Sequence, residues 1–191
     1  MNATTDVLLE VDGLRKYFPI QKGFFKKTVA YVKAVDDVTL RVRRGEVLGV
    51  VGESGCGKTT LGRCLVRVYD PTGGNIILRT GDREIDVAHL GGDQMREFRR
   101  SVQMIFQDPY ASLNPRMNVL ETVGEPLKVN GLASGRELED RVGKVIQQVG
   151  LRIEHLRRYP HSFSGGQRQR IGIARALVLD PQLVIADEPV S

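Results

Sequence analysis

The string Gly-Glu-Ser-Gly-Cys-Gly-Lys-Thr at residues 52–59 constrains this chain more than any other feature. It follows the apolar run 47–51, which predicts a buried strand, and it precedes residues 60–68, where apolar side chains recur at helical spacing. A glycine-rich turn between a strand and a helix binds phosphate, because its N–H groups turn inward and the helix dipole favours an anion. The sequence therefore predicts a phosphate-binding loop.

Two side chains of this loop carry chemistry beyond its backbone N–H groups. Lys58 adds a point charge that reaches the β- and γ-phosphates, and the Thr59 hydroxyl is suited to bind Mg²⁺. A glycine-rich turn that matches by chance is the alternative, and the strand and helix around the string argue against it. The candidate nucleotide-binding residues are Gly52, Glu53, Ser54, Gly55, Cys56, Gly57, Lys58, Thr59 and Thr60.

Length and composition allow one globular domain with a subdomain, since 191 residues can bury a substantial core. The net charge of +5 is mild and the basic residues are scattered, which favours solvated faces and phosphate or partner contacts over a nucleic-acid patch. No segment approaches the ~20 apolar residues of a membrane span, and the first residues lack a signal-peptide pattern. Cys56 and Cys64 indicate neither a disulfide framework nor a metal site.

Alternating and apolar runs predict further strands, and a basic, aromatic-rich segment at 18–28 is expected to form a loop. The strands are expected at 7–13, 38–43, 75–79, 84–87, 102–106 and 183–187. Residues 109–163 are predicted to form a helical insert. Its best-defined helix spans 134–150 and is expected to open with a capping box, in which Ser134 and Glu137 satisfy each other's backbone.

Four motifs occur in a fixed order: the phosphate loop, Phe-Gln-Asp-Pro at 106–109, Phe-Ser-Gly-Gly-Gln at 163–167, and an apolar strand that ends in Asp187-Glu188. In this order they resemble the ATP-binding cassette (ABC) ATPases. The strings at 107–117 and 158–161 are similar to those of the ATP-binding subunits of oligopeptide and dipeptide importers, whose relatives also carry nickel. The resemblance extends from about residue 7 to the end of the chain.

The resemblance implies an α/β fold with a P-loop NTPase core sheet, an antiparallel β subdomain and the helical insert at about 109–163. Residues 1–191 would form an incomplete ABC ATPase domain, truncated at the C-terminal side, because the family continues with a dimer-interface loop and a strand ending in a γ-phosphate histidine. That strand would lie between the phosphate-loop strand and strand 183–187. We therefore expect the chain alone to be marginally stable and to lack sustained ATPase activity.

The resemblance also assigns roles to residues that follow the strands. Asp187 would hold Mg²⁺ and Glu188 would act as general base, whereas the alternative for both is a turn acid after a strand. Gln107 would bind Mg²⁺ or water and relay the nucleotide state to a membrane subunit; otherwise it is an exposed loop residue. The metal candidates are Thr59, Gln107 and Asp187, and the catalytic candidates are Lys58, Gln107 and Glu188.

The motif at 163–167 would reach the γ-phosphate held by a second cassette, so that two chains enclose two ATP molecules head to tail. Its cofactor-binding candidates are Ser164, Gly165, Gly166 and Gln167, and a plain capping box is the alternative. Phe163 replaces the usual leucine and is expected only to pack the turn. Tyr17 would stack on adenine, with Phe18 as the substitute. His155 and His161 are expected to have a structural or interface role, with an acid–base role as the alternative.

The predicted function is ATP binding and hydrolysis, with Mg²⁺, that powers import of peptides or a similar solute. The expected partners are integral membrane permease subunits and a second ABC ATPase subunit, at the cytoplasmic side of the membrane and without nucleic acid. Residues 114–117 would lie near the membrane partner. The alternatives are a soluble cassette that acts on nucleic acid or in an enzyme assembly, and a module that only binds nucleotide.

Overall fold

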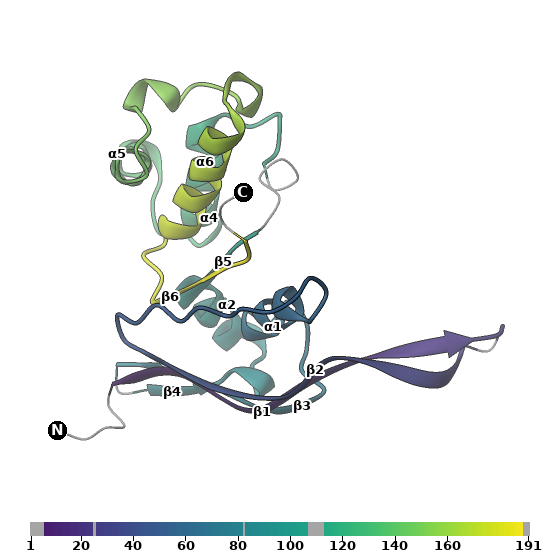
Figure 1. The fold of residues 1–191 in the computed structure, drawn as a ribbon. Helices are drawn as coiled ribbons and strands as arrows, with labels where there is room; N and C mark the ends of the chain where they lie inside the picture. Colours follow the sequence, from purple (N-terminus) through teal and green to yellow (C-terminus); the bar gives the residue numbers. More distant parts are fainter. Residues whose placement is uncertain (1–5, 25, 82, 107–112, 189–191) are drawn as a thin grey trace. The chain divides into compact units, whose positions relative to one another are not determined.

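The computed structural model describes residues 6–24, 26–81, 83–106 and 113–188, which form two compact units. The N-terminal unit spans residues 1–98 and the C-terminal unit spans residues 99–191. Each unit has its own sheet and helices (Figure 1).

The N-terminal unit contains a four-stranded antiparallel sheet in the order β2-β1-β3-β4. Alternating side chains produce it, because one face of each strand carries the apolar residues that are buried. Leu9, Val11, Ile76 and Leu78 lie on that buried face. The strands are β1 (Val7–Lys22), β2 (Lys27–Arg43), β3 (Gly73–Thr80) and β4 (Arg83–Asp86), and the helices are α1 (Lys58–Leu65), η1 (Val87–His89) and α2 (Gly92–Ser101).

The other face of this sheet carries an ion network centred on Glu10. Its carboxylate lies 2.8 Å from Arg79 on β3 and 2.7 Å from Arg41 on β2, so it joins three strands. Hydrogen bonds from Arg79 and then Arg41 hold the pKa of Glu10 below its usual value. Exposed ion pairs contribute little to stability, so the network serves mainly to fix the register of the strands.

The first two strands are much longer than predicted, and the prediction of a loop at 18–28 is wrong. Pairing between β1 and β2 continues from Val7↔Arg43 to Lys22↔Lys27, and the described residues between the two strands, 23, 24 and 26, are turn residues. Tyr, Phe, Ile and Val side chains favour extended backbone, and this preference prevails over the basic character on which the loop prediction was based.

The predicted strand at 47–51 is also wrong. The structure assigns no strand there, and Val47 and Val51 are 97% and 94% exposed. A strand requires a neighbouring backbone to accept and donate its hydrogen bonds, and no strand among the described residues pairs with this run. Apolar composition alone could not supply that partner.

The C-terminal unit combines a short parallel sheet with a helical core. Strand β5 (Val102–Ile105) pairs in register with β6 (Leu183–Ala186), which confirms the strands expected near 102 and 183. A parallel pair needs a long crossover, and here the crossover contains the helices. They are α4 (Val119–Val129), α5 (Gly135–Gln148), η2 (Ile153–His155), η3 (Pro160–Ser162) and α6 (Gly165–Leu177).

Apolar faces of α4, α5 and α6 pack against one another to form the core of this unit. Val123, Val142, Ile146, Ile171 and Ala174 are fully buried in it. The spacing of three or four residues along each helix explains why these side chains share one face.

The helix starts show which capping signals the fold uses. The capping box predicted at Ser134 is wrong: Ser134 precedes α5, but its side chain makes no capping bond. Gly135 follows with φ +54°, and Glu137 pairs with Arg141 instead. The box forms at α4, where Asn118 and Glu121 bond each other's backbone N–H at 2.9 Å.

Among the described residues, no helix has the length and apolar character needed to cross a membrane.

The packing of the helical core predicts the effect of Ile171→Ala. Removing this buried side chain should lower the free energy of unfolding by about 2–5 kcal/mol, because it deletes methyl groups and leaves a cavity. The matched control is Val129→Ala, since Val129 is 79% exposed at the end of α4. Urea denaturation followed by circular dichroism measures both, and equal losses would contradict the assigned core.

Candidate functional site

The loop at 52–57 is built on glycines that the geometry requires. Gly55 and Gly57 have φ +80° and +100°, in the left-handed region that other residues rarely adopt. A Cβ on Gly57 would lie 2.1 Å from the Ala34 carbonyl oxygen, and one on Gly52 would lie 2.6 Å from the Cys56 sulfur. The loop is therefore folded tightly and rests against the backbone of β2.

Lys58, the first residue of α1, folds back over this loop. Its Nζ donates to the carbonyl oxygens of Gly52 at 2.8 Å and Glu53 at 2.7 Å. The first turn of α1 contains no acidic residue, so no carboxylate there opposes the positive end of the helix dipole. A curved backbone, an ammonium group and a helix N-terminus thus occupy one place, and this combination fits a phosphate group.

Tyr17 lies on β1, opposite the part of β2 against which the loop rests. It pairs with Lys33, the residue before Ala34, and the ammonium of Lys33 lies 5.3 Å from its ring centre. Its hydroxyl donates a hydrogen bond to Asp36, which raises the pKa of Tyr17. Phe18 instead packs edge-on against Tyr69 at 5.4 Å between ring centres.

In the C-terminal unit, the carboxyl ends of β5 and β6 coincide, because Ile105 is paired with Ala186. Asp187 follows directly, and its N–H donates to the Ile105 carbonyl at 2.9 Å. Asp187 is only 8% exposed, whereas Glu188 is exposed and has φ +47°. The two adjacent carboxylates therefore have different surroundings. Gln107 lies outside the described residues.

The turn at 163–167 forms the capping box that the sequence suggested as one reading. Ser164 Oγ accepts from the N–H of Gln167 at 3.3 Å, and Gln167 Oε1 accepts from the N–H of Ser164 at 3.1 Å. A Cβ on Gly166 would meet no atom within 4 Å, so this helix start is open on one side. The capping box therefore does not fill the space beside Gly166 at the N-terminus of α6.

Aromatic contacts and a half-buried arginine support this turn. Phe163 is buried, as expected for a residue that packs the turn, and meets the ring of His155 edge-on at 5.3 Å. His161 stacks on Tyr159 at 5.9 Å. Arg168 donates to the carbonyl of Pro160 at 2.8 Å. Both histidines therefore make packing contacts, in agreement with the structural role predicted for them.

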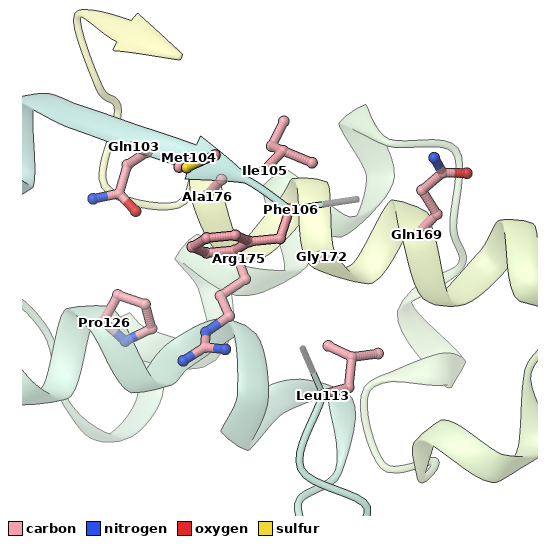
Figure 2. Close-up of a pocket in the computed structure, with 10 residues that line it drawn as sticks. All are labelled: Gln103, Met104, Ile105, Phe106, Leu113, Pro126, Gln169, Gly172, Arg175 and Ala176. Atoms are coloured by element: carbon pink, nitrogen blue, oxygen red, sulfur yellow. The ribbon is translucent and has the colours of Figure 1, made fainter. Parts of the chain in front are cut away.

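A pocket in the C-terminal unit was not predicted from the sequence (Figure 2). It encloses about 240 Å³ between β5, α4 and α6. Figure 2 shows the Arg175 side chain beside Phe106 in this pocket. The Arg175 guanidinium also pairs with Glu125 at 2.8 Å. No local signal could reveal the pocket, because its walls come from segments up to about 70 residues apart in the sequence. The lining residues are Gln103, Met104, Ile105, Phe106, Leu113, Pro126, Gln169, Gly172, Arg175 and Ala176.

Metal binding at these sites would depend on the ligand as well as the protein. Within the described ranges, no group of three or more His, Cys, Asp or Glu side chains could hold a metal ion. Mg²⁺ commonly binds through one or two protein oxygens together with the phosphates of a nucleotide. One buried carboxylate at the end of β6, Asp187, is compatible with that mode of binding.

Comparison with known families decides what kind of protein carries this geometry. The ABC transporter family matches residues 35–191, which include the phosphate loop, the turn at 163–167 and Asp187. The chain belongs to the ABC transporter family. The resemblance inferred from the four ordered motifs is thereby confirmed.

Curated relatives narrow the comparison to peptide transport. The chain is 48% identical to the oligopeptide transport ATP-binding protein AppF of Bacillus subtilis, over 99% of this chain and 56% of AppF. It is also 48% identical to the dipeptide transport ATP-binding protein DppF of Haemophilus influenzae, over 96% of this chain and 55% of that protein. The chain thus spans about half the length of the curated relatives it matches.

Solved structures confirm the α/β cassette fold of this ABC chain. The ATP-binding cassette MJ0796, in a dimeric post-hydrolysis state with ADP and Pi, aligns with a TM-score of 0.81 at 27% identity. That alignment covers 96% of this chain and 75% of MJ0796. Clostridium perfringens cbiO1, part of the cbiONQ ABC transporter complex, aligns with a TM-score of 0.73 at 29% identity, over 96% of this chain and 66% of cbiO1.

The loop geometry predicts that the two cysteines react very differently. Cys56 is exposed in the loop, whereas Cys64 is buried in α1, where desolvation raises its pKa to about 11. Since the thiolate is the reactive form, a thiol reagent at pH 8 should label one cysteine rapidly and the second only after denaturation. Cys56→Ser should remove the rapid phase. Two rapid phases in the native protein would contradict the placement of Cys64.

Proposed function

We propose that this chain is the nucleotide-binding cassette of an importer that uses ATP hydrolysis to move peptides or a similar solute. The observation that carries the proposal is the loop at 52–57, whose glycine backbone and Lys58 ammonium form a phosphate cradle at the N-terminus of α1. The names of its curated relatives, which are oligopeptide and dipeptide transport ATP-binding proteins, support the substrate class. No observation favours a soluble cassette outside transport.

Residues 52–60 would hold the phosphates of ATP. Backbone N–H groups of the loop bind the phosphate oxygens, and Lys58 exchanges its carbonyl partners for the β- and γ-phosphates. Tyr17 is the proposed adenine-stacking residue, because it pairs with Lys33 on β2, next to Ala34, where the loop rests on that strand. Its ring is already oriented by the bond to Asp36.

The edge after β5 and β6 would supply the hydrolytic chemistry. Mg²⁺ neutralises charge on the phosphates when it is bound. Asp187, Thr59 and Gln107 are its proposed protein ligands. Glu188 is the proposed general base, since its exposed carboxylate can accept a proton from water while the buried Asp187 serves the metal.

The helix start at 164–167 is proposed to bind the γ-phosphate of a second cassette. Support comes from the open N-terminus of α6 and from the dimeric state named for the solved MJ0796 cassette. Ser164, Gly165, Gly166 and Gln167 would contribute backbone N–H groups and the Ser164 hydroxyl. The partner would be a second ABC ATPase subunit, identical or related.

We further propose that integral membrane permease subunits bind the C-terminal unit at the cytoplasmic side of the membrane. The pocket between β5, α4 and α6 is a suitable receptor, because Phe106 and Leu113 offer apolar surface beside the Arg175–Glu125 ion pair (Figure 2). The pocket contains Phe106, which immediately precedes the proposed magnesium ligand Gln107. A permease segment there would contact the residue that precedes Gln107 in the sequence, and Gln107 is proposed to sense the nucleotide.

Lys58→Ala in the full-length subunit should abolish ATP binding at physiological nucleotide concentrations. The substitution removes a charge-assisted contact from the centre of the cradle. Isothermal titration calorimetry with ATP measures the effect, and Lys144→Ala on α5 is a matched control at an exposed position. An unchanged affinity would show that the loop does not bind the phosphates.

Glu188→Gln in the full-length subunit should leave ATP binding intact and slow hydrolysis by about a hundredfold or more, as expected when a general base is removed. Because closure no longer leads to turnover, an ATP-stabilised dimer should accumulate in size-exclusion chromatography. Phosphate release is the primary measurement, and Glu154→Gln on η2 is the control. Normal turnover would transfer the base role to another residue.

A further inference from the structure

The β1–β2 hairpin continues well beyond the sheet of the N-terminal unit. Pairing between β1 and β3 ends at Arg15↔Gly73, whereas β1 and β2 remain paired to Lys22↔Lys27. Residues 17–33, which we term the hairpin arm, thus form a two-stranded extension that Figure 1 shows projecting from the sheet. At about 3.3 Å per residue the arm extends for roughly 20 Å.

The arm and its base concentrate the positive charge of the chain. Residues 13–35 include six Lys or Arg side chains and no Asp or Glu. Since the net charge of the whole chain is +5, the residues outside this segment are together close to neutral. At the base, Arg15 pairs with Asp37 at 2.9 Å and Lys33 with Asp36 at 3.2 Å. Lys16, also at the base, donates to the backbone carbonyl of Asp70 at 2.8 Å, and the three remaining lysines are at the tip.

Three lysines at the tip have no carboxylate partner among the described residues: Lys22, Lys26 and Lys27. Lys22 and Lys27 are direct cross-strand partners. Like charges in directly opposed positions destabilise a strand pair, so this arrangement has a folding cost that the hairpin itself does not offset. An anionic partner would remove the repulsion.

Apolar side chains accompany these charges. Phe24 lies in the turn and is 98% exposed. Ile20, Val29, Tyr31 and Val32 are also exposed along the strands of the arm. Lysines on an edge strand can serve simply to prevent strand pairing between molecules, but that role does not explain an exposed aromatic ring between them.

We propose that the hairpin arm binds an anionic membrane surface. Lys22, Lys26 and Lys27 contact the phosphates of lipid headgroups, and the Phe24 ring enters the boundary between headgroups and acyl chains. Membrane fits better than nucleic acid, because the exposed apolar side chains along the strands are aliphatic except for Tyr31, and Ile20, Val29 and Val32 provide no stacking surface for bases. The contact goes beyond the proposed ATPase and needs no nucleotide.

Vesicle flotation without nucleotide tests the proposal. The chain should float with vesicles of phosphatidylcholine mixed with phosphatidylglycerol and should remain unbound with phosphatidylcholine alone. Rising salt should weaken the binding, since the Debye length falls from about 10 Å at 0.1 M to about 3 Å at 1 M ionic strength.

The decisive variant combines Lys26→Glu with Lys27→Glu. Each lysine near an anionic surface contributes about a fivefold gain in partitioning, so the double variant should bind at least about 25-fold more weakly. The matched control, Arg136→Glu with Lys144→Glu on α5, makes the same change in net charge at exposed positions and should bind within about twofold of the parent. Circular dichroism verifies that both variants are folded.

A second variant tests the apolar contribution separately. Phe24→Ser should weaken binding about fivefold, because only part of the ring is withdrawn from water, and should leave the salt dependence unchanged. The proposal is overturned if the double variant binds normally, or if the α5 control loses as much affinity. It is equally overturned if a short nucleic-acid duplex competes the chain away from anionic vesicles while Phe24→Ser has no effect.

Discussion

The close approach of Gly57 to the Ala34 carbonyl supports the phosphate loop, and much of the N-terminal unit depends on it. Any Cβ at Gly57 would lie within 2.1 Å of that oxygen, so only glycine allows the loop to rest on β2. The position of β2 is in turn fixed by its long pairing with β1. Tyr17 and the hairpin arm belong to the β1–β2 ladder, and the loop rests on it at Ala34. A change in the pairing of these two strands would therefore alter the surroundings of all three.

A comparable constraint orders the edge of the C-terminal unit. The bond from the N–H of Asp187 to the carbonyl of Ile105 extends the β5–β6 ladder by one residue and holds a buried carboxylate at its end. Glu188 then adopts φ +47°, which costs about 1–3 kcal/mol for a residue with a side chain. The left-handed backbone at Glu188 accompanies a change from the buried carboxylate of Asp187 to an exposed one. This difference in exposure is consistent with separate roles for the two acids.

Local signals in the sequence predicted the glycine turn before α1 and the strand before Asp187, and they offered the box at Ser164 as an alternative, because each depends mainly on neighbouring residues. Two predictions that depended on whether a distant strand pairs with the segment were wrong. The run 47–51 is apolar but no described strand pairs with it, and segment 18–28 is basic yet pairs across a hairpin. Ser134 lost its predicted box because Gly135 turns the backbone at the start of α5.

The distribution of charge shows the same dependence on register. In the sequence, Lys22 and the pair Lys26-Lys27 are separate features of a chain whose basic residues look scattered. The pairing of Lys22 with Lys27 places these lysines at one end of the hairpin with Lys26 and the exposed Phe24, so neighbouring positions form one cationic and apolar tip. Because β2 also supports Gly57, one hairpin is linked to two features that we propose to bind anions in different ways. The glycine-built cradle suits a small phosphate group, whereas the open tip, with charge spread around an exposed ring, suits an extended anionic surface.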